Sequence, residues 1–214
     1  MLSSLFTDPL GLLTLLIAFL AALTFHEFSH GLVAKLLGDD TAERMGRLTL
    51  NPIPHIDPIG LLAVMFAGFG WAKPVPYNPY NLRDQKWGPV LVAAAGPLSN
   101  LAFFLVVGLI YKGLAAAGML VAGSPLVGFL QALMYINVAL FAFNLIPIPP
   151  LDGSKFLSLA LQHPRHLRTR VWLETQGPTA LIIAIIADSF LLNGMVFGTI
   201  LNVLSRFAFG LLGL

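Results

Sequence analysis

Long stretches without a charged residue limit the folds open to this chain more than any other feature. Residues 9–25 and 88–111 contain none, and no charged residue lies between Lys112 and Asp152. About 20 consecutive apolar residues let a helix cross the hydrocarbon core of a bilayer, which is roughly 30 Å thick. The pattern therefore predicts an integral membrane protein with several spanning helices.

The composition agrees with this class. Hydrophobic residues make up 57% of the 214 residues and charged residues only 10%, whereas soluble domains carry roughly 25% charged residues. We expect one domain over residues 1–214 that lies in the lipid bilayer of the cell membrane and crosses it several times. The net charge of +2 gives no indication of nucleic-acid binding, and nothing in the sequence indicates an oligomeric state.

Three spanning helices are predicted to form a core over about residues 9–160. They cover residues 9–38, 88–111 and 126–148. Gly38 is expected to end the first helix, and a group of prolines that begins at Pro147 is expected to end the third. The Gly96-Pro97 pair is expected to allow the second helix to approach its neighbours closely.

The apolar region from about residue 175 to 213 is harder to interpret. Asp188, Asn193 and Gly194 lie near its middle, so we expect a hairpin of two helices, although one bent helix fits the same pattern. Asp188 would then lie at the exposed tip of the hairpin. The basic segment 155–174, which precedes this region, is expected to be solvated.

A small membrane-associated element of irregular or β structure is predicted between the first two spans. Residues 47–50 alternate as in a short strand, and the uncharged, glycine-containing segment 58–72 is too short for a span, so it is expected to re-enter the membrane. Residues 73–77 must be extended because residues before proline avoid the helical region. Such extended pieces could hold a substrate as an added strand.

Basic residues predict the orientation of the bundle. Nine of them lie in two connections: Arg44, Arg47, Lys73, Arg83, Lys86, Lys155, Arg165, Arg168 and Arg170. Lysine and arginine are enriched in cytoplasmic loops, so segments 39–87 and 155–174 should face the cytoplasm and the connection after Lys112 should face outwards. His26, towards the end of the first helix, then lies nearer the cytoplasmic face.

The strongest chemical signal is the run His26-Glu27-Phe28-Ser29-His30. Residues four apart lie on one face of a helix, so both imidazoles can bind one zinc ion, and the glutamate beside them can act as the general base of a metalloprotease. Ionisable groups are expensive inside a membrane and are usually functional there. The chain has no cysteine, so any metal must be held by nitrogen and oxygen ligands.

A catalytic zinc normally has three protein ligands and a water molecule, so one more ligand is needed. The candidates are Asp152, His55, His163 and His166, with Asp57 and Asp188 as weaker alternatives. Asp152 follows a proline-rich segment that unwinds the end of the third span, on the side of the membrane where His26 is expected. It could equally well be the N-cap of a following helix, and the spacing alone leaves these two interpretations open.

Three groups of residues together resemble the site-2 protease family of intramembrane zinc metalloproteases. They are His26 to His30, the element from Asn144 through Pro150 to Leu151-Asp152-Gly153, and Ala95-Gly96-Pro97-Leu98-Ser99-Asn100 together with the stretch from Asn51 to Gly60. The resemblance runs from about residue 10 to residue 160, with the motifs in the family's order.

The resemblance implies a role for each matching residue. His26, His30 and Asp152 would bind one zinc ion per chain, Glu27 would be the catalytic base, and Asn144 would position the substrate backbone. Asn100 is a further candidate for substrate binding. The family cleaves membrane-spanning proteins, often in regulated intramembrane proteolysis. The alternatives are a metal transporter and a non-catalytic zinc-binding membrane protein.

Overall fold

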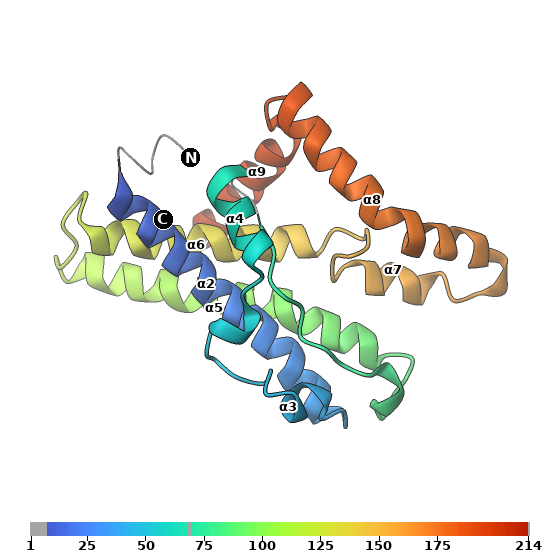
Figure 1. Cartoon of the computed structure of the whole chain (residues 1–214). Coiled ribbons are helices and arrows are strands. Elements are labelled where there is room, and N and C mark those ends of the chain that lie inside the picture. Colours follow the sequence, from blue (N-terminus) through green and yellow to red (C-terminus); the bar gives the residue numbers. More distant parts are fainter. Residues whose placement is uncertain (1–7, 68–69, 214) are drawn as a thin grey trace.

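The computed structural model describes residues 8–67 and 70–213, with side-chain burial omitted for residues 65–67, and all the regular elements in these ranges are helices. Three long helices form the centre of the fold: α2 (Pro9–Leu36), α5 (Gly88–Ala116) and α6 (Pro125–Asn144). They pack against one another (Figure 1). Their contact is an apolar core that includes Ala22, Phe104 and Met134. The three predicted core spans are therefore confirmed as long apolar helices.

Local chemistry fixes the ends of these helices. Asp8 caps α2 by accepting a hydrogen bond from the Gly11 N–H at 2.8 Å, and Gly38, with a φ of 110°, follows its end. Helix α6 ends at Asn144, four residues before the predicted boundary. Continuing it would press the ring of Pro147 against the carbonyl of Phe143.

The outer faces of the bundle are apolar. Leu98, Leu109 and Ile110 of α5 are all at least half exposed. Among the described residues, four helices are long and apolar enough to cross a membrane: α2, α5, α6 and α9 (Met195–Leu212). Because such surfaces are stable in lipid and costly in water, the chain is a polytopic membrane protein.

The connection between α2 and α5 is mostly irregular. It contains α3 (Thr41–Arg44), the 3-10 turns η1 (Ile53–His55) and η2 (Pro79–Asn81), and α4 (Pro58–Ala67). The strand predicted at residues 47–50 is wrong, since residues 48–50 form bends. The alternation there has no partner strand, and the Arg47 side chain instead donates to the Lys73 carbonyl.

Among the described residues of this region, extended pairing occurs at the junction between η1 and the segment after residue 70. Ile56 and Ala72 form a single antiparallel bridge, and the Lys73 N–H donates to the His55 carbonyl at 2.9 Å. Part of the predicted re-entrant segment is the helix α4, and Gly68 and Phe69 lie outside the described residues. Its insertion into the membrane remains a prediction.

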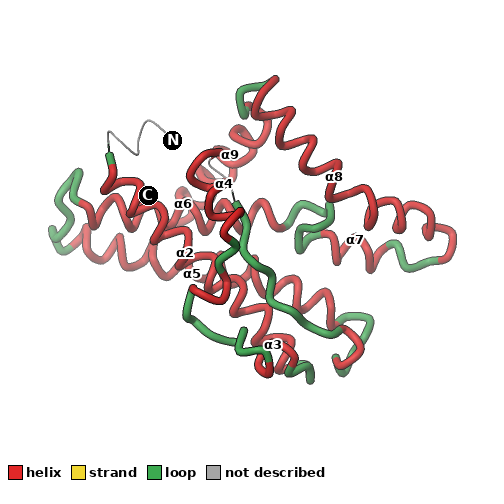
Figure 2. The backbone as a smooth tube through the Cα atoms, viewed as in Figure 1, coloured by secondary structure: helices red, strands yellow, loops and turns green. Residues whose placement is uncertain are grey.

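Residues 73–78 form an extended segment, here called the strap, as the prolines predict. In Figure 2 it is the loop that follows α4 and crosses the helices on its way to α5. Helix α5 then continues past Pro97 without a break. The strap lies against α2, because the Val75 N–H donates a hydrogen bond to the Glu27 side chain.

The C-terminal region is the predicted hairpin of two helices. After α7 (Ser154–Ala160) and η3 (Pro164–His166), the helices α8 (Leu167–Leu191) and α9 are joined by a turn in which Gly194 has a φ of 71°. Helix α8 begins at Leu167, within the segment 155–174 that was expected to be solvated.

The expected exposure of Asp188 is wrong, because this residue is 4% exposed. Its carboxylate accepts hydrogen bonds from the N–H groups of Val196 at 2.9 Å and Phe197 at 3.2 Å. These are orphan donors of the first turn of α9, so Asp188 caps the second helix of the hairpin.

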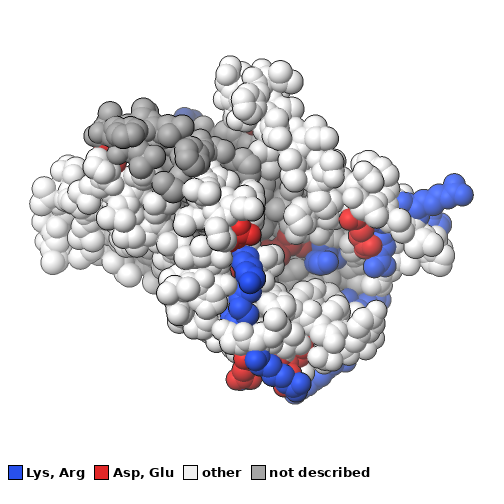
Figure 3. All heavy atoms as spheres, viewed as in Figure 1, with Lys and Arg blue, Asp and Glu red and all other residues white. Residues whose placement is uncertain are grey.

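Charged side chains gather on one part of the visible surface. In Figure 3 they lie over the region of α3 and over α7 and the start of α8, whereas the end where α5 meets α6 is almost free of them. The structure thus keeps the two basic connections apart from the connection after Lys112.

Candidate metal centre

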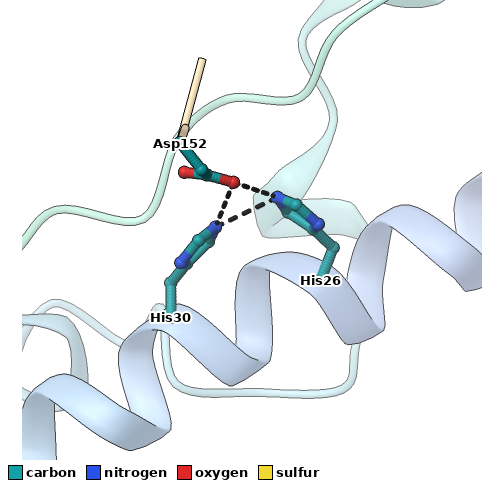
Figure 4. Close-up of side chains that lie close together, drawn as sticks. All are labelled: His26, His30 and Asp152. Carbon is teal, nitrogen blue, oxygen red and sulfur yellow. Dashed lines mark hydrogen bonds and ion pairs between the residues drawn. The ribbon is translucent and has the colours of Figure 1, made fainter. Parts of the chain in front are cut away.

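Two elements that are distant in sequence bring the proposed zinc ligands together. His26 and His30 lie one turn apart on α2, and Asp152 lies in the loop between α6 and α7 (Figure 4). The Oδ2 atom of Asp152 is 3.2 Å from the Nε2 atom of His26 and 3.3 Å from that of His30. The two Nε2 atoms are 3.0 Å apart. All three side chains point to a common centre.

The loop after α6 returns Asp152 to the bundle. The Gly153 N–H donates to the carbonyl of Asn144 at 2.6 Å, which closes the loop on the end of the helix. A side chain at Gly153 would collide with the backbone of Leu145. Gly153 itself precedes α7, and no side chain caps that helix. The alternative in which Asp152 is an N-cap is therefore wrong.

The orientation of His26 is fixed by a buried amide pair. The Nδ1 atom of His26 lies 2.7 Å from the Oδ1 atom of Asn100. The Asn100 NH2 group donates to the carbonyl of Ala22 at 3.2 Å and to the Oδ1 atom of Asn137 at 2.9 Å. The amide oxygen of Asn100 therefore faces His26 and accepts its Nδ1 proton, which leaves the Nε2 lone pair free for a metal.

The side chain of Asn100 is completely buried, and its amide oxygen and NH2 group are engaged within the protein. It thus contacts His26, and its predicted contact with a substrate remains a prediction. Asn137 was not among the candidate residues predicted from the sequence. A polar residue in the middle of an apolar helix is nevertheless a sign of a structural or functional contact.

His30 is fixed in the same way by the backbone of α5. Its Nδ1 atom lies 2.7 Å from the carbonyl oxygen of Val92. A carbonyl oxygen can only accept, so this nitrogen donates and the Nε2 atom again presents its lone pair. A Cβ atom at Gly96 would lie 2.6 Å from the Nε2 atom of His26. Gly96 thus provides the space in front of both rings, as the predicted close packing requires.

The donor set fits a bound zinc ion. Two imidazole lone pairs and a carboxylate oxygen converge, and such groups repel one another unless a cation lies between them. The Oδ2 atom of Asp152 is buried and makes no hydrogen bond. Ligands about 2.0–2.1 Å from a tetrahedral zinc are about 3.3 Å apart, which agrees with the separations of 3.0–3.3 Å.

Asp152 has the charge that a metal ligand needs. Burial raises the pKa of its carboxyl group, but hydrogen bonds and charge interactions with the two imidazole rings in their protonated form outweigh burial and lower the pKa to about 2. The residue is therefore ionised at neutral pH. Burial and the negative charge of Asp152 raise the pKa of Tyr77, so the strap passes near the same centre.

Glu27 lies beside the centre but is not one of its three converging groups. Its side chain is buried, and its Oε2 atom accepts a hydrogen bond from the Val75 N–H at 2.8 Å. The carboxylate is thus held between α2 and the strap. The Val75 N–H could not be predicted as a contact of Glu27 from the type of its side chain. The only indication in the sequence was the position of Val75 between two prolines.

The remaining candidates lie elsewhere. The imidazole of His55 interacts with the Thr49 carbonyl, and Asp57 caps α4. His163 and His166 adjoin or belong to η3 and are not among the converging ligand groups. Among the described residues, one group could hold a metal ion: His26, His30 and Asp152.

The structure leaves the role of Asn144 as a prediction. Its side chain donates to the carbonyl of Leu140 at 3.0 Å, within its own helix. Its backbone carbonyl closes the loop that carries Asp152, which is a contribution to the site that the sequence did not indicate.

Comparisons with known proteins place this geometry in a family. The model of peptidase family M50 matches residues 109–185, a segment that includes Asp152. YwhC of Bacillus subtilis, which carries the name of a zinc metalloprotease, is 43% identical over 155 residues, and the match covers 70% of each chain. No solved structure matches.

More distant relatives carry the same kind of name. MJ0611 of Methanocaldococcus jannaschii is 31% identical over 147 residues, which cover 66% of this chain and 68% of the relative. Rip2 of Mycolicibacterium smegmatis is 33% identical over 155 residues, which cover 67% of this chain and 56% of the relative. All are named as zinc metalloproteases, and this agrees with the donor set around His26. The chain belongs to peptidase family M50, the site-2 protease family of membrane zinc metalloproteases.

Proposed function

We propose that this chain is an intramembrane zinc endopeptidase that hydrolyses peptide bonds in or near the membrane-spanning segments of other proteins, as in regulated intramembrane proteolysis. One observation carries the proposal: a convergent His26, His30 and Asp152 group lies beside a buried Glu27 on an apolar helix long enough to cross a membrane.

His26, His30 and Asp152 would hold one zinc ion, and three protein ligands leave a tetrahedral position open. When bound, zinc would polarise a peptide carbonyl and lower the pKa of water to roughly 7. The histidines supply neutral nitrogen donors because Asn100 and Val92 accept their Nδ1 protons. Asp152 supplies a negative charge that offsets part of the charge of the metal.

Glu27 is the general base in this proposal. It accepts a proton from the attacking water and passes it to the leaving amine. This proton transfer needs a carboxylate that is close to the metal but does not bind it. Its place outside the three converging ligand atoms, on the neighbouring helical position, supports that role.

The substrate must be extended at the bond that is cleaved, because a helix hides its carbonyl groups. The strap is a poor partner for a full added strand. Pro74 and Pro76 have no N–H, and the N–H groups of Lys73, Val75 and Asn78 already donate within the protein. Its carbonyl groups are the main contacts it can offer to an extended substrate, and Asn144 remains a proposed contact to the substrate backbone.

The distribution of basic residues supports a location of the centre nearer the cytoplasmic face of the cell membrane. Metal transport and purely structural zinc binding are the alternative functions. Neither needs a buried carboxylate beside the metal ligands, and a structural zinc site normally has four protein ligands.

The test is cleavage of a membrane-spanning substrate by purified protein, combined with zinc analysis. Glu27→Gln should keep about one zinc ion per chain and lose about 10²–10⁴-fold in cleavage rate. Glu174→Gln, which removes an exposed carboxylate paired with Arg170, is the matched control and should cleave normally. Full activity of Glu27→Gln, or metal flux into vesicles that survives this change, would refute the proposal.

A further inference from the structure

A single backbone donor reaches the carboxylate of Glu27. In the run Pro74-Val75-Pro76, only Val75 has an N–H group. That group donates to the Oε2 atom of Glu27 at 2.8 Å. The two prolines also keep the chain extended on either side of it, so the donor is presented by a stiff segment.

The Lys73 end of the strap is anchored on both sides of its peptide group. The Lys73 N–H donates to the His55 carbonyl at 2.9 Å, and the buried Arg47 side chain donates to the Lys73 carbonyl at 2.6 Å. A buried guanidinium that reaches across to a backbone carbonyl forms a strong charge-assisted hydrogen bond. This end is therefore held by the connection between α2 and α5.

The Asn78 end is anchored by Asp39, just after the end of α2. Asp39 is completely buried, and it accepts the Asn78 N–H at 2.7 Å and the Asn81 side-chain N–H at 2.9 Å. A little further on, the Arg83 N–H donates to the Leu37 carbonyl at 2.8 Å. The strap is thus fixed at both ends, to His55 and Arg47 at Lys73 and to Asp39 at Asn78, with Val75 between the anchors.

The side chain of Val75 is packed as closely as its backbone. Val75 is 8% exposed, and a Cβ atom at Gly31 would lie 3.2 Å from its Cγ1 atom. Gly31 follows Glu27 by one helical turn, on the same face of α2. The missing side chain of Gly31 lets the strap come close enough for its N–H to reach Glu27.

We propose that the strap, residues 73–78, is the positioning element for the general base and that the Val75 N–H is the group through which it acts. This inference rests on the proposed role of Glu27. Val75 is a positioning residue: it holds Oε2 and leaves Oε1 to take the proton. A glutamate has three rotatable side-chain bonds, so without this contact its carboxylate would sample several orientations around the metal centre.

The experiment removes the N–H and keeps the side chain. The α-hydroxy analogue of valine, incorporated at position 75, replaces the amide by an ester and deletes only this donor. Val75→Pro deletes the same donor genetically, and Val75→Ala keeps the donor while shortening the side chain. Each protein is compared with wild type for zinc content, kcat and KM on a membrane-spanning substrate.

The ester and Val75→Pro should lower kcat by about 10–10²-fold, as misplacement of a catalytic group does. KM should stay within about twofold, and zinc content should stay at about one ion per chain. Val75→Ala keeps the N–H donor, so it should lose much less kcat than the ester variant. An unchanged kcat in the ester variant, an equal loss in Val75→Ala, or loss of zinc from the ester variant would overturn the inference.

A second measurement does not depend on activity. Hydrogen exchange of a peptide covering residues 73–77 reports few amides, because two of its residues are prolines. In Glu27→Ala, about one more amide hydrogen of this peptide should exchange quickly than in wild type. In Glu174→Ala, the exchange of this peptide should be unchanged. No change in Glu27→Ala would refute the contact. Glu27→Gln with full activity would instead refute the proposed function, so the two failures can be told apart.

Discussion

Alanine in place of Gly96 tests the space in front of the two histidines. A Cβ atom there would lie 2.6 Å from the Nε2 atom of His26 and closer still to that of His30, whereas ordinary contact begins at 3.4 Å. The ring of His26 would have to retreat by about 0.8 Å, the difference between these two distances, and that of His30 by about 1.0 Å. Functional sites tolerate displacements of only about 0.5 Å, so both ring nitrogens would leave the common centre.

The expected result is a loss of zinc affinity of at least about 10–100-fold, the range typical for disturbing the groups that support metal ligands. Competition with a chromogenic chelator in detergent solution measures it. Helix content should be unchanged, because alanine favours a helix over glycine.

Gly113→Ala is the control, since Gly113 lies on the same helix and a Cβ atom there meets nothing within 4 Å. It should bind zinc like wild type. Wild-type zinc affinity in Gly96→Ala would show that the two imidazoles do not meet at this centre, and the reasoning about the site would fail.

Three further predictions concern the surroundings of the centre. Asn100→Leu should weaken zinc binding by about 10–100-fold because the Nδ1 proton of His26 loses its acceptor; chelator competition checks this, and unchanged affinity would contradict it. The pKa of Asp39 lies below its ordinary value, because burial, which raises it, is outweighed by hydrogen bonds from Thr41, Asn81 and Asn78. Its stabilising contribution is therefore complete above roughly pH 3.9, the ordinary value for aspartate, and is lost as the pH falls through the lower folded-state pKa. Asp39→Asn should lower Tm at neutral pH and flatten the fall of Tm in acid, and a wild-type Tm profile would refute the anchor. A cysteine in place of Val121, which is 70% exposed, should be labelled only from outside the cell, and one in place of Lys86 only from the cytoplasm; the reverse pattern would overturn the orientation.

The sequence predicted the parts of the site that depend on helical spacing. His26, Glu27 and His30 could be placed because residues four apart share a face of any helix. Asp152 needed the family resemblance, since the path of a loop that contains three prolines is not encoded in periodicity. The structure supplies the cause: the Gly153 N–H closes the loop on Asn144.

The errors have physical reasons of the same kind. Alternation at residues 47–50 suggested a strand, but a strand needs a partner, and the Arg47 side chain was used for another contact. Asp188 was expected at the surface because it lies near the tip of the hairpin, yet the start of the next helix supplies N–H donors to its carboxylate. The contact of Asn100 with His26 could not be predicted, because it joins two helices and so leaves no trace in local sequence.

The central claim is that Asp152 completes the zinc site while Glu27 stays outside it. The zinc dissociation constants of wild type, Glu27→Gln, Asp152→Ala and His55→Ala, measured side by side by chelator competition, test it most directly. Loss of a supporting group costs about 10–100-fold in metal affinity, so Asp152→Ala should weaken binding by more than about 10²-fold, while Glu27→Gln and His55→Ala should bind zinc nearly as wild type does. Normal zinc binding by Asp152→Ala together with loss of zinc from His55→Ala or Glu27→Gln would contradict the account.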